Sequence, residues 1–389
     1  MLTLSKLSHA RGSSLIQVAC VGMFTIYEVT HMSNKGLSGS AIGILLAIEN
    51  GLLLASAPLW GWLADRFACY KQLVSGSALG LAFALYWLSR SETIADFAIY
   101  VCLRGLLLTA MSSTMTALAM SNLASNSPGR GFSAYRIFGS IGFMSGSFLF
   151  PIIFQKIEHI LIAGACLLPL SLYFVLQLEN PPRRDQGQNG EAKSPIPAAA
   201  WIFLAAHFII SITEPGNLGF LNDYVRELGG SPKLMGWYSA LTGLIALVSL
   251  PAMGRWVDAR GLYWVLGLGF FSQAIRPFVI SSLSDPNWLW LSHLCHAFGW
   301  AGREVGALIL MISLLGTQRR ATAVSLIVAI RMAGTMVGSY LMGTWADRYG
   351  YPEMFQRISL IALASLPLLF LAFRAARKKP AAASAAPSA

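Results

Sequence analysis

Charged side chains are scarce in this chain of 389 residues. Asp, Glu, Lys and Arg together make up only 12% of it, whereas soluble domains carry roughly 25%. Hydrophobic residues supply 55% of the chain, and the mean hydropathy is +0.59. So few water-facing side chains exclude a large soluble enzyme, a disordered protein and a nucleic-acid-binding module. A lipid bilayer must therefore solvate most of the surface.

Cysteine and the common catalytic motifs are also sparse or missing. The five cysteines are scattered through apolar segments, which excludes a disulfide framework and a metal cluster. The sequence has no Walker-type phosphate loop, metal-ligand cluster or nucleophile arrangement, so we expect no cofactor, no direct use of ATP and no enzymatic activity. The net charge of +11 does not indicate a nucleic-acid partner, because the basic residues are not gathered on one face.

Long apolar runs, by contrast, recur along the whole chain. A membrane-crossing helix needs about 20 mostly apolar residues, and this rule predicts an all-α membrane protein with twelve transmembrane helices. The first run leads into further membrane sequence, so we expect no cleavable signal peptide. The predicted spans lie near residues 12–32, 39–64, 72–89, 96–122, 132–156, 159–178, 198–221, 234–256, 262–281, 287–315, 322–344 and 356–374.

The distribution of basic residues predicts the orientation. With both termini inside, the inner segments carry sixteen of the 28 Lys and Arg residues and the outer segments carry seven, the other five lying within spans. An excess of basic residues marks cytoplasmic loops. We therefore expect a multi-pass protein of the bacterial cytoplasmic (inner) membrane with both termini in the cytoplasm.

One polar segment, residues 180–197, interrupts the apolar pattern and is typical of a flexible cytoplasmic linker. It divides the chain into an N-terminal six-helix bundle, residues 1–179, and a C-terminal six-helix bundle, residues 198–375. The tail, residues 376–389, ends in Ala, Pro and Ser only, and we expect it to be disordered.

The two halves also repeat each other in sequence. Such a repeat predicts two pseudo-symmetric bundles that rock around a substrate held near the bilayer midplane. Glycines recur every three to five residues in spans 5 and 11, at Gly139, Gly142, Gly146, Gly334 and Gly338, and predict close helix packing. Four pairs carry the repeat, at offsets of 186, 193, 199 and 195 residues: Glu28 with Glu214, Asp65 with Asp258, Arg104 with Arg303, and Arg136 with Arg331.

The loop after span 2 resembles a motif of the major facilitator superfamily. Residues 61–66, Gly-Trp-Leu-Ala-Asp-Arg, match the start of the pattern G-x-x-x-D-R-x-G-R-[KR], with Ala68 and Cys69 departing from it and Lys71 keeping one charge. Residues 254–261 form a weaker copy in the second half. In that family these residues latch the cytoplasmic side; the alternative is a solvated loop that only fixes topology. The resemblance implies a gating role for Asp65, Arg66, Lys71, Asp258 and Arg260.

Further segments resemble the branch that contains the lactose permease, the phenylpropionate permease and the nucleoside–proton symporters. They are residues 136–143 in span 5, residues 293–298 in span 10, and residues 343–350 after span 11. In this branch the span 5 arginine contacts substrate, and an aromatic residue soon after it stacks on a sugar in the lactose permease. The resemblance therefore implies that Arg136 and Phe143 bind substrate, and it assigns a functional role to His296.

One position departs from that branch. The lactose permease has a coupling carboxylate one turn after its span 10 histidine, and Gly299 occupies this place here. We therefore do not expect proton coupling by that arrangement.

Nine charged residues fall inside predicted spans. Each costs about 2.5–3.5 kcal/mol at a lipid-facing helix centre, so we expect them to face a wet cavity or one another. Arg303 and Glu304 point about 100° apart on a helix, so one should face the cavity while the other pairs with span 11, where Arg331 is a candidate. The nine residues are Glu28, Glu49, Arg104, Arg136, Glu214, Arg276, Arg303, Glu304 and Arg331.

These charges suggest roles in transport. Glu28 and Glu214 are candidates for substrate contact or proton carriage, with structural pairing as the alternative. Arg276 is expected to form a structural pair, and Arg104 either resembles the family's span 4 motif or forms an intramembrane salt bridge. A proton-coupling or charge network is predicted for Glu49, Arg104, His293, Arg303, Glu304 and Arg331.

Taken together, the sequence predicts a monomeric secondary active transporter that works by alternating access. The expected substrate is a small polar or anionic organic solute, of the sugar, nucleoside or aromatic acid class, imported with protons. A proton-coupled exporter on the same scaffold, a lipid-handling flippase and a non-transporting receptor are the alternatives.

Overall fold

In the computed structural model, residues 5–122, 128–181, 195–217, 219–316 and 319–377 are described, and all their regular secondary structure is helical. These residues contain twelve helices that are long and apolar enough to cross a membrane. The prediction of twelve spans is therefore confirmed. Most of the predicted linker and the tail after residue 377 lie outside the described residues.

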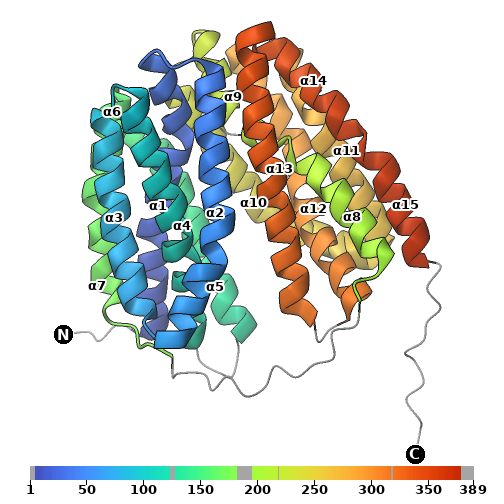
Figure 1. Ribbon diagram of the computed structural model, residues 1–389, viewed down its shortest axis with the longest axis horizontal. Coiled ribbons are helices and arrows are strands. Elements are labelled where there is room, and N and C mark those ends of the chain that lie inside the picture. Colours follow the sequence, from blue (N-terminus) through green and yellow to red (C-terminus); the bar gives the residue numbers. More distant parts are fainter. Residues whose placement is uncertain (1–4, 123–127, 182–194, 218, 317–318, 378–389) are drawn as a thin grey trace, which may run out of the picture.

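Six spans build the first bundle, drawn from blue to green in Figure 1. The first span begins at Lys6 rather than near residue 12, because Ser5 already caps the helix by accepting the N–H of Ser8. Ser38 caps the second span in the same way. The spans are α1 (Lys6–Asn34), α2 (Gly39–Phe67), α3 (Tyr70–Arg90), α4 (Ile94–Asn122), α5 (Pro128–Ile153), and a sixth made of α6 (Ile157–Leu167), η1 (Leu168–Leu170) and α7 (Ser171–Val175).

The second bundle contains a span that the sequence did not predict to be broken. Span 7 is interrupted by a 3-10 turn that begins at Glu214 and carries Pro215 and Gly216, which disfavour a regular helix. The elements are α8 (Ala198–Ser211), η2 (Glu214–Asn217), α9 (Gly219–Glu227), α10 (Pro232–Arg260), α11 (Leu262–Ser281), η3 (Pro286–Leu291), α12 (Ser292–Leu315), α13 (Arg320–Tyr349), α14 (Tyr351–Leu363) and α15 (Ser365–Arg377).

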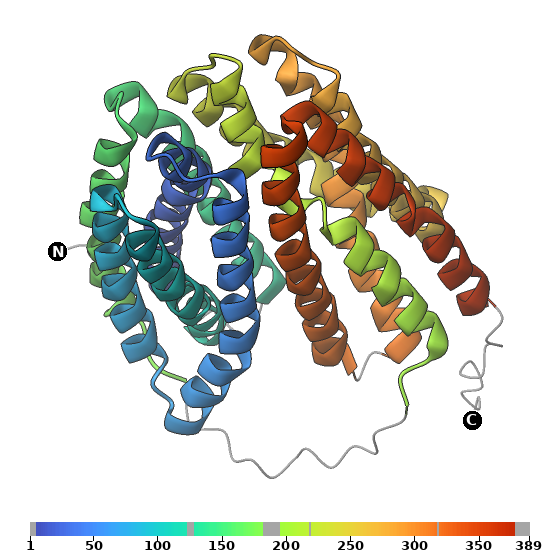
Figure 2. The ribbon, with the colours of Figure 1, turned by 45° about the horizontal axis from the view of Figure 1, so that its top comes forward.

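The two bundles stand side by side, and their described helices converge toward one end and diverge toward the other (Figures 1 and 2). We call the end where α1 begins and α15 ends the linker end, and the opposite end, where α2 and α10 begin, the distal end. At the distal end one apolar core includes residues of both bundles, such as Phe24 and Phe355. Toward the linker end each bundle has its own core, and a cavity can form between them.

The glycine-rich faces of spans 5 and 11 pack as predicted. A Cβ atom at Gly146 of α5 would lie 2.0 Å from the carbonyl oxygen of Ala19 in α1. A Cβ atom at Gly338 of α13 would lie 2.2 Å from the carbonyl oxygen of Ile212, just after α8. Each bundle therefore joins its first and fifth spans through glycine, which confirms close packing at equivalent places in the repeat.

Gly146→Ala is expected to lower the stability of the purified protein by about 1–3 kcal/mol, because the added methyl group overpacks the contact with α1. Gly76→Ala is the matched control, because no atom lies within 4 Å of a Cβ at that position in α3. The control should leave the melting temperature unchanged or raise it slightly, since Ala favours helix more than Gly. Equal melting temperatures for the two variants would contradict the packing.

Candidate functional site

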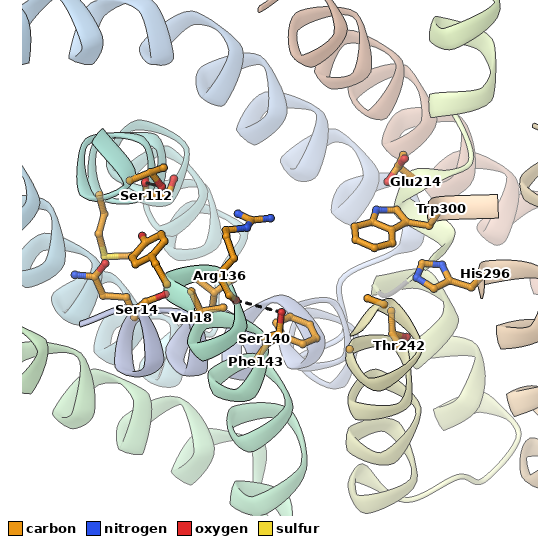
Figure 3. A pocket seen from close by; sticks show the side chains of 18 residues that line it. Ser14, Val18, Ser112, Arg136, Ser140, Phe143, Glu214, Thr242, His296 and Trp300 are labelled. Carbon is orange, nitrogen blue, oxygen red and sulfur yellow. Dashed lines mark hydrogen bonds between the residues drawn. The ribbon is translucent and has the colours of Figure 1, made fainter. Parts of the chain in front are cut away.

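A cavity of ≈ 420 Å³ lies between the bundles, on the linker side of the shared core. Its first wall comes from α1, α4 and α5, and its second wall from η2, α10 and α12 (Figure 3). The polar and aromatic lining residues are Ser14, Gln17, Ser112, Thr116, Tyr135, Arg136, Ser140, Phe143, Glu214, Thr242, His296 and Trp300.

Arg136 extends from α5 into this cavity, toward the wall that carries Glu214, Trp300 and His296 (Figure 3). Its side chain is exposed to the cavity, and among the described residues no acidic group forms an ion pair with it. Four of the five residues predicted to bind substrate, Arg136, Phe143, Glu214 and His296, thus line a single space.

Glu214 is held by the second bundle. Its carboxylate accepts a hydrogen bond from Arg303 Nη2, and Arg303 is fully buried while 20% of the Glu214 side chain is exposed. The next residue, Glu304, lies 2.6 Å from Arg331 Nη1 and 3.9 Å from Arg303. Arg303 and Glu304 therefore point to different partners, and Glu304 pairs with Arg331 as expected. The expectation that the other residue faces the cavity is wrong, because Arg303 is fully buried behind Glu214.

The equivalent acid of the first bundle lies elsewhere. Glu28 is buried, and its carboxylate accepts hydrogen bonds from Arg104 Nη1 at 2.5 Å and from Tyr100 Oη at 2.9 Å. Glu49 of α2 lies 2.7 Å from the same Arg104 nitrogen. We call Glu28, Glu49 and Arg104 the triad. The prediction that Glu28 contacts substrate as Glu214 does is not met in this conformation, because only Glu214 lines the cavity.

The sequence repeat is therefore also a repeat of contacts. In each bundle an acid of the first span pairs with an arginine of the fourth span: Glu28 with Arg104, and Glu214 with Arg303. The bundles differ in what surrounds the pair. In the first, Glu49 adds a second buried acid, whereas in the second the 3-10 turn brings Glu214 to the cavity surface.

The histidines of α12 lie beside the cavity. His296 stacks on Trp300 with 5.8 Å between ring centroids, and its Nδ1 lies 3.2 Å from Arg276 Nη1. Because the guanidinium can only donate, Nδ1 accepts, and a neutral His296 carries its proton on Nε2. His293 Nε2 lies 3.0 Å from Thr242 Oγ1. Arg276, expected to form a structural pair, thus orients a cavity residue.

The glycine that replaces the branch's coupling carboxylate has a physical explanation. A Cβ atom at Gly299 would lie 2.9 Å from the backbone nitrogen of Gln273 in α11. The backbones of α11 and α12 are too close at this point for an acidic side chain.

The predicted gating loops lie at the linker end. Asp65 accepts a hydrogen bond from Tyr70 Oη, and Lys71 Nζ donates to the carbonyl oxygen of Leu176 at 2.8 Å, both within the first bundle. Arg66, Asp258 and Arg260 are exposed. The contacts described for these loops therefore do not join the bundles in this conformation.

Polar contacts between the bundles occur instead at the distal end. Asp347, at the end of α13, accepts the backbone N–H groups of Gly39 and Ser40 at 2.6 and 2.7 Å and so caps α2 of the other bundle. Arg226 Nη2 donates to Ser33 Oγ at 2.6 Å in the same region. Asp347 lies in the 343–350 segment that resembles the permease branch, but the sequence pattern predicted no role for it.

Asp347→Ala is expected to loosen the distal contact, because losing a helix cap costs about 0.5–2 kcal/mol. This loss corresponds to an increase of about 2- to 30-fold in the population of molecules whose distal end is open. Maleimide labelling of Val29→Cys, a residue that is 1% exposed and packs against Gly219, measures this opening. Asp285→Ala removes a cap within the second bundle and is the control. Equal labelling rates in both variants would show that Asp347 does not hold the distal end closed.

Twelve membrane-spanning helices in the described residues, arranged in two bundles around a charged cavity, are typical of membrane transporters. A profile of the MFS_1-like family matches residues 11–357, and the chain belongs to this family of the major facilitator superfamily. The maltose permease of Geobacillus stearothermophilus is 25% identical over 386 residues, covering 92% of this chain and 93% of that protein. The multidrug resistance protein MdtG of Enterobacter lignolyticus is 22% identical, covering 82% of this chain and 79% of that protein.

Solved structures share the fold. The nucleoside transporter NupG superposes with a TM-score of 0.78 at 15% identity, covering 97% of this chain and all of that chain. A bacterial homologue of the lysosomal transporter Spinster, in an inward-facing and occupied conformation, gives 0.77 at 13% identity, covering 96% and 98%. The resemblance to the superfamily drawn from the sequence is confirmed.

Proposed function

We propose that this protein imports a small polar or anionic organic solute with protons by alternating access. The observation that carries the proposal is the cavity between the bundles, which is lined by Arg136 and by Glu214, itself held by the buried Arg303, and which lies beneath a closed distal end. The solute class comprises sugars, nucleosides and aromatic acids. The protein acts as a monomer in the bilayer.

The linker end is proposed to face the cytoplasm of a bacterial cell. The excess of basic residues in its segments, sixteen against seven, supports this orientation. The structure then corresponds to an inward-facing state. When the linker end closes in turn, the loops that carry Asp65, Arg66, Lys71, Asp258 and Arg260 are proposed to meet and gate it.

The lining residues support a polar solute with a ring or planar body. Hydroxyl and amide groups such as those of Ser14, Gln17 and Thr242 can bond to a solute, while Phe143 and Trp300 offer apolar faces. A maltose permease and a nucleoside transporter are among the similar proteins, which agrees with such a solute.

The triad is the proposed proton site. Its two buried carboxylates and one guanidinium together carry a formal charge of −1. A net charge is costly in a low-dielectric interior unless one of the acids is protonated. Glu28 accepts from Tyr100 as well as Arg104 and is the better stabilised anion, so the proton is assigned to Glu49. The second network, Glu214, Arg303, Glu304 and Arg331, with His293 and His296, is proposed to respond to the solute.

An exporter is the second candidate, favoured by the similarity to MdtG. Proteoliposomes under an imposed pH gradient separate the two: solute entering with an inward proton gradient indicates symport, and solute leaving indicates antiport. A thermal-shift screen with maltose, uridine and benzoate identifies the solute, with Arg136→Ala losing the response and the exposed Arg90→Ala keeping it. No flux for a stabilising solute in either direction would contradict both.

A further inference from the structure

The nine charged residues inside the spans form two groups whose net charges have opposite signs. The triad, with two acids and one arginine, carries a formal charge of −1 in the first bundle and does not line the cavity. The second group holds four arginines and two glutamates, a formal charge of +2. Two of its residues, Arg136 and Glu214, line the cavity, and the other four lie behind the lining, where Arg276 contacts His296 and Arg303 contacts Glu214. Its members are Arg136, Arg276, Arg303, Arg331, Glu214 and Glu304.

The sequence repeat shows where this excess arises. Arg331 in α13 forms an ion pair with Glu304, the residue that directly follows Arg303. The residue that directly follows Arg104, the counterpart of Arg303, is Gly105. Arg136, the counterpart of Arg331, therefore lacks the acid that the repeat would supply.

The fold leaves no room for that acid. A Cβ atom at Gly105 would lie 2.8 Å from Leu52 Cβ and 3.0 Å from the carbonyl oxygen of Glu49. The close packing of α4 on α2 that builds the triad thus excludes a glutamate at position 105. Among the described residues Arg136 has no ion pair, and its side chain is exposed in the cavity.

We infer that the solute is an organic anion whose carboxylate, or equivalent acidic group, pairs with Arg136 in place of the missing glutamate. A guanidinium binds a carboxylate through two parallel hydrogen bonds, which gives direction as well as charge. Trp300 and Phe143 flank the rest of the anion, and hydroxyl groups such as that of Thr242 bond to its polar atoms. This inference rests on the proposed function and narrows its solute class from polar or anionic to anionic.

The charge division also gives a physical basis for coupling. An anion in the cavity lowers the charge there from +2, and a proton on the triad cancels −1. A carrier loaded with both has less uncompensated buried charge than a carrier loaded with one, and buried unpaired charge is costly. The fully loaded carrier therefore closes its linker end more readily than a singly loaded one.

Anion accumulation in the cavity can be measured without knowing the solute, by fluorescence quenching of Trp300 with iodide and with caesium ions. The Trp300 signal is the difference between the protein and Trp300→Phe. A net charge of +2 near the ring predicts an iodide-to-caesium quenching ratio about fivefold higher than that of free N-acetyltryptophanamide, which corrects for the different intrinsic efficiencies of the two ions. A ratio equal to or below that of the free compound would overturn the inference.

Two variants test the role of Arg136. Arg136→Gln removes the cation, and Ser140→Glu adds an acid one helical turn along α5; each should lower the iodide preference about twofold. Ser140→Gln is the matched neutral control and should keep it, as should the exposed Arg90→Gln. An unchanged iodide preference in both Arg136→Gln and Ser140→Glu would remove Arg136 as the anion site.

Matched solutes separate this inference from the proposed function. Benzoate with benzamide, and gluconate with glucose, differ mainly in charge, and only the anionic members are expected to raise the melting temperature. Proton-driven uptake of a neutral sugar or nucleoside would overturn the inference that the solute is an anion, but it would agree with the proposed symport. A preference for iodide without any proton-driven flux would contradict the proposed symport, but it would agree with the inferred positive charge of the cavity.

Discussion

Glu49→Gln is expected to abolish accumulation of the solute while exchange across the membrane continues. Glutamine has the shape of protonated Glu49, and it leaves the neutral pair of Glu28 with Arg104 intact. With one proton carried for each solute, a gradient of one pH unit supports about tenfold accumulation, which should fall to about onefold. Proteoliposome uptake and counterflow between pH 6 and pH 8 measure both activities, and uptake by the variant should be independent of pH.

Glu92→Gln is the control for this prediction, because Glu92 is an exposed acid in the distal loop between α3 and α4. It should accumulate solute like the unmodified protein. Accumulation by Glu49→Gln that is equal to that of the control would show that the triad does not carry the proton. Loss of both accumulation and counterflow would instead show that Glu49 is required for the conformational change itself.

Glu214→Ala is expected to destabilise the protein by about 3 kcal/mol, because removing one partner leaves a buried charge uncompensated. Arg303 is fully buried, and the next acid, Glu304, lies 3.9 Å from it and already pairs with Arg331. We expect the low end of the range for buried pairs, since 20% of the Glu214 side chain is exposed. Thermal unfolding in detergent and solute uptake measure the effect, and uptake should be lost.

The double variant Glu214→Ala with Arg303→Met separates stability from function. Replacing a buried ion pair by apolar side chains is often neutral for stability, so the melting temperature should largely recover while uptake stays lost. A double variant less stable than Glu214→Ala would contradict the pairing. Recovered uptake would show that the pair is structural only.

Much of the fold could be predicted from the sequence because apolar runs of membrane-spanning length leave few alternatives. The repeat also matched Glu28 with Glu214 and Arg104 with Arg303, and the structure pairs each of these acids with the arginine of its own bundle. The spacing of Arg303 and Glu304 similarly indicated that they serve different partners. These inferences needed only helix geometry and the cost of charge in lipid.

Other features depend on contacts between elements that sequence spacing does not reveal. Glu28 and Glu214 match in sequence, yet one is buried by Glu49 and Tyr100 while the other reaches the cavity on a 3-10 turn. The cap of α2 by Asp347 joins positions 308 residues apart in different bundles. Such a contact follows from how the bundles meet, and neither helix shows it alone.

Distance measurements between spin labels at the two ends test the account most directly. With the five native cysteines replaced, labels at Glu92→Cys and Glu353→Cys report the distal end, and labels at Phe67→Cys and Ala259→Cys report the linker end; all four positions are exposed. On adding solute at low pH, the distal distance should lengthen and the linker-end distance should shorten in the same molecules. Distances that stay fixed, or that change in the same direction at both ends, would contradict alternating access around the central cavity.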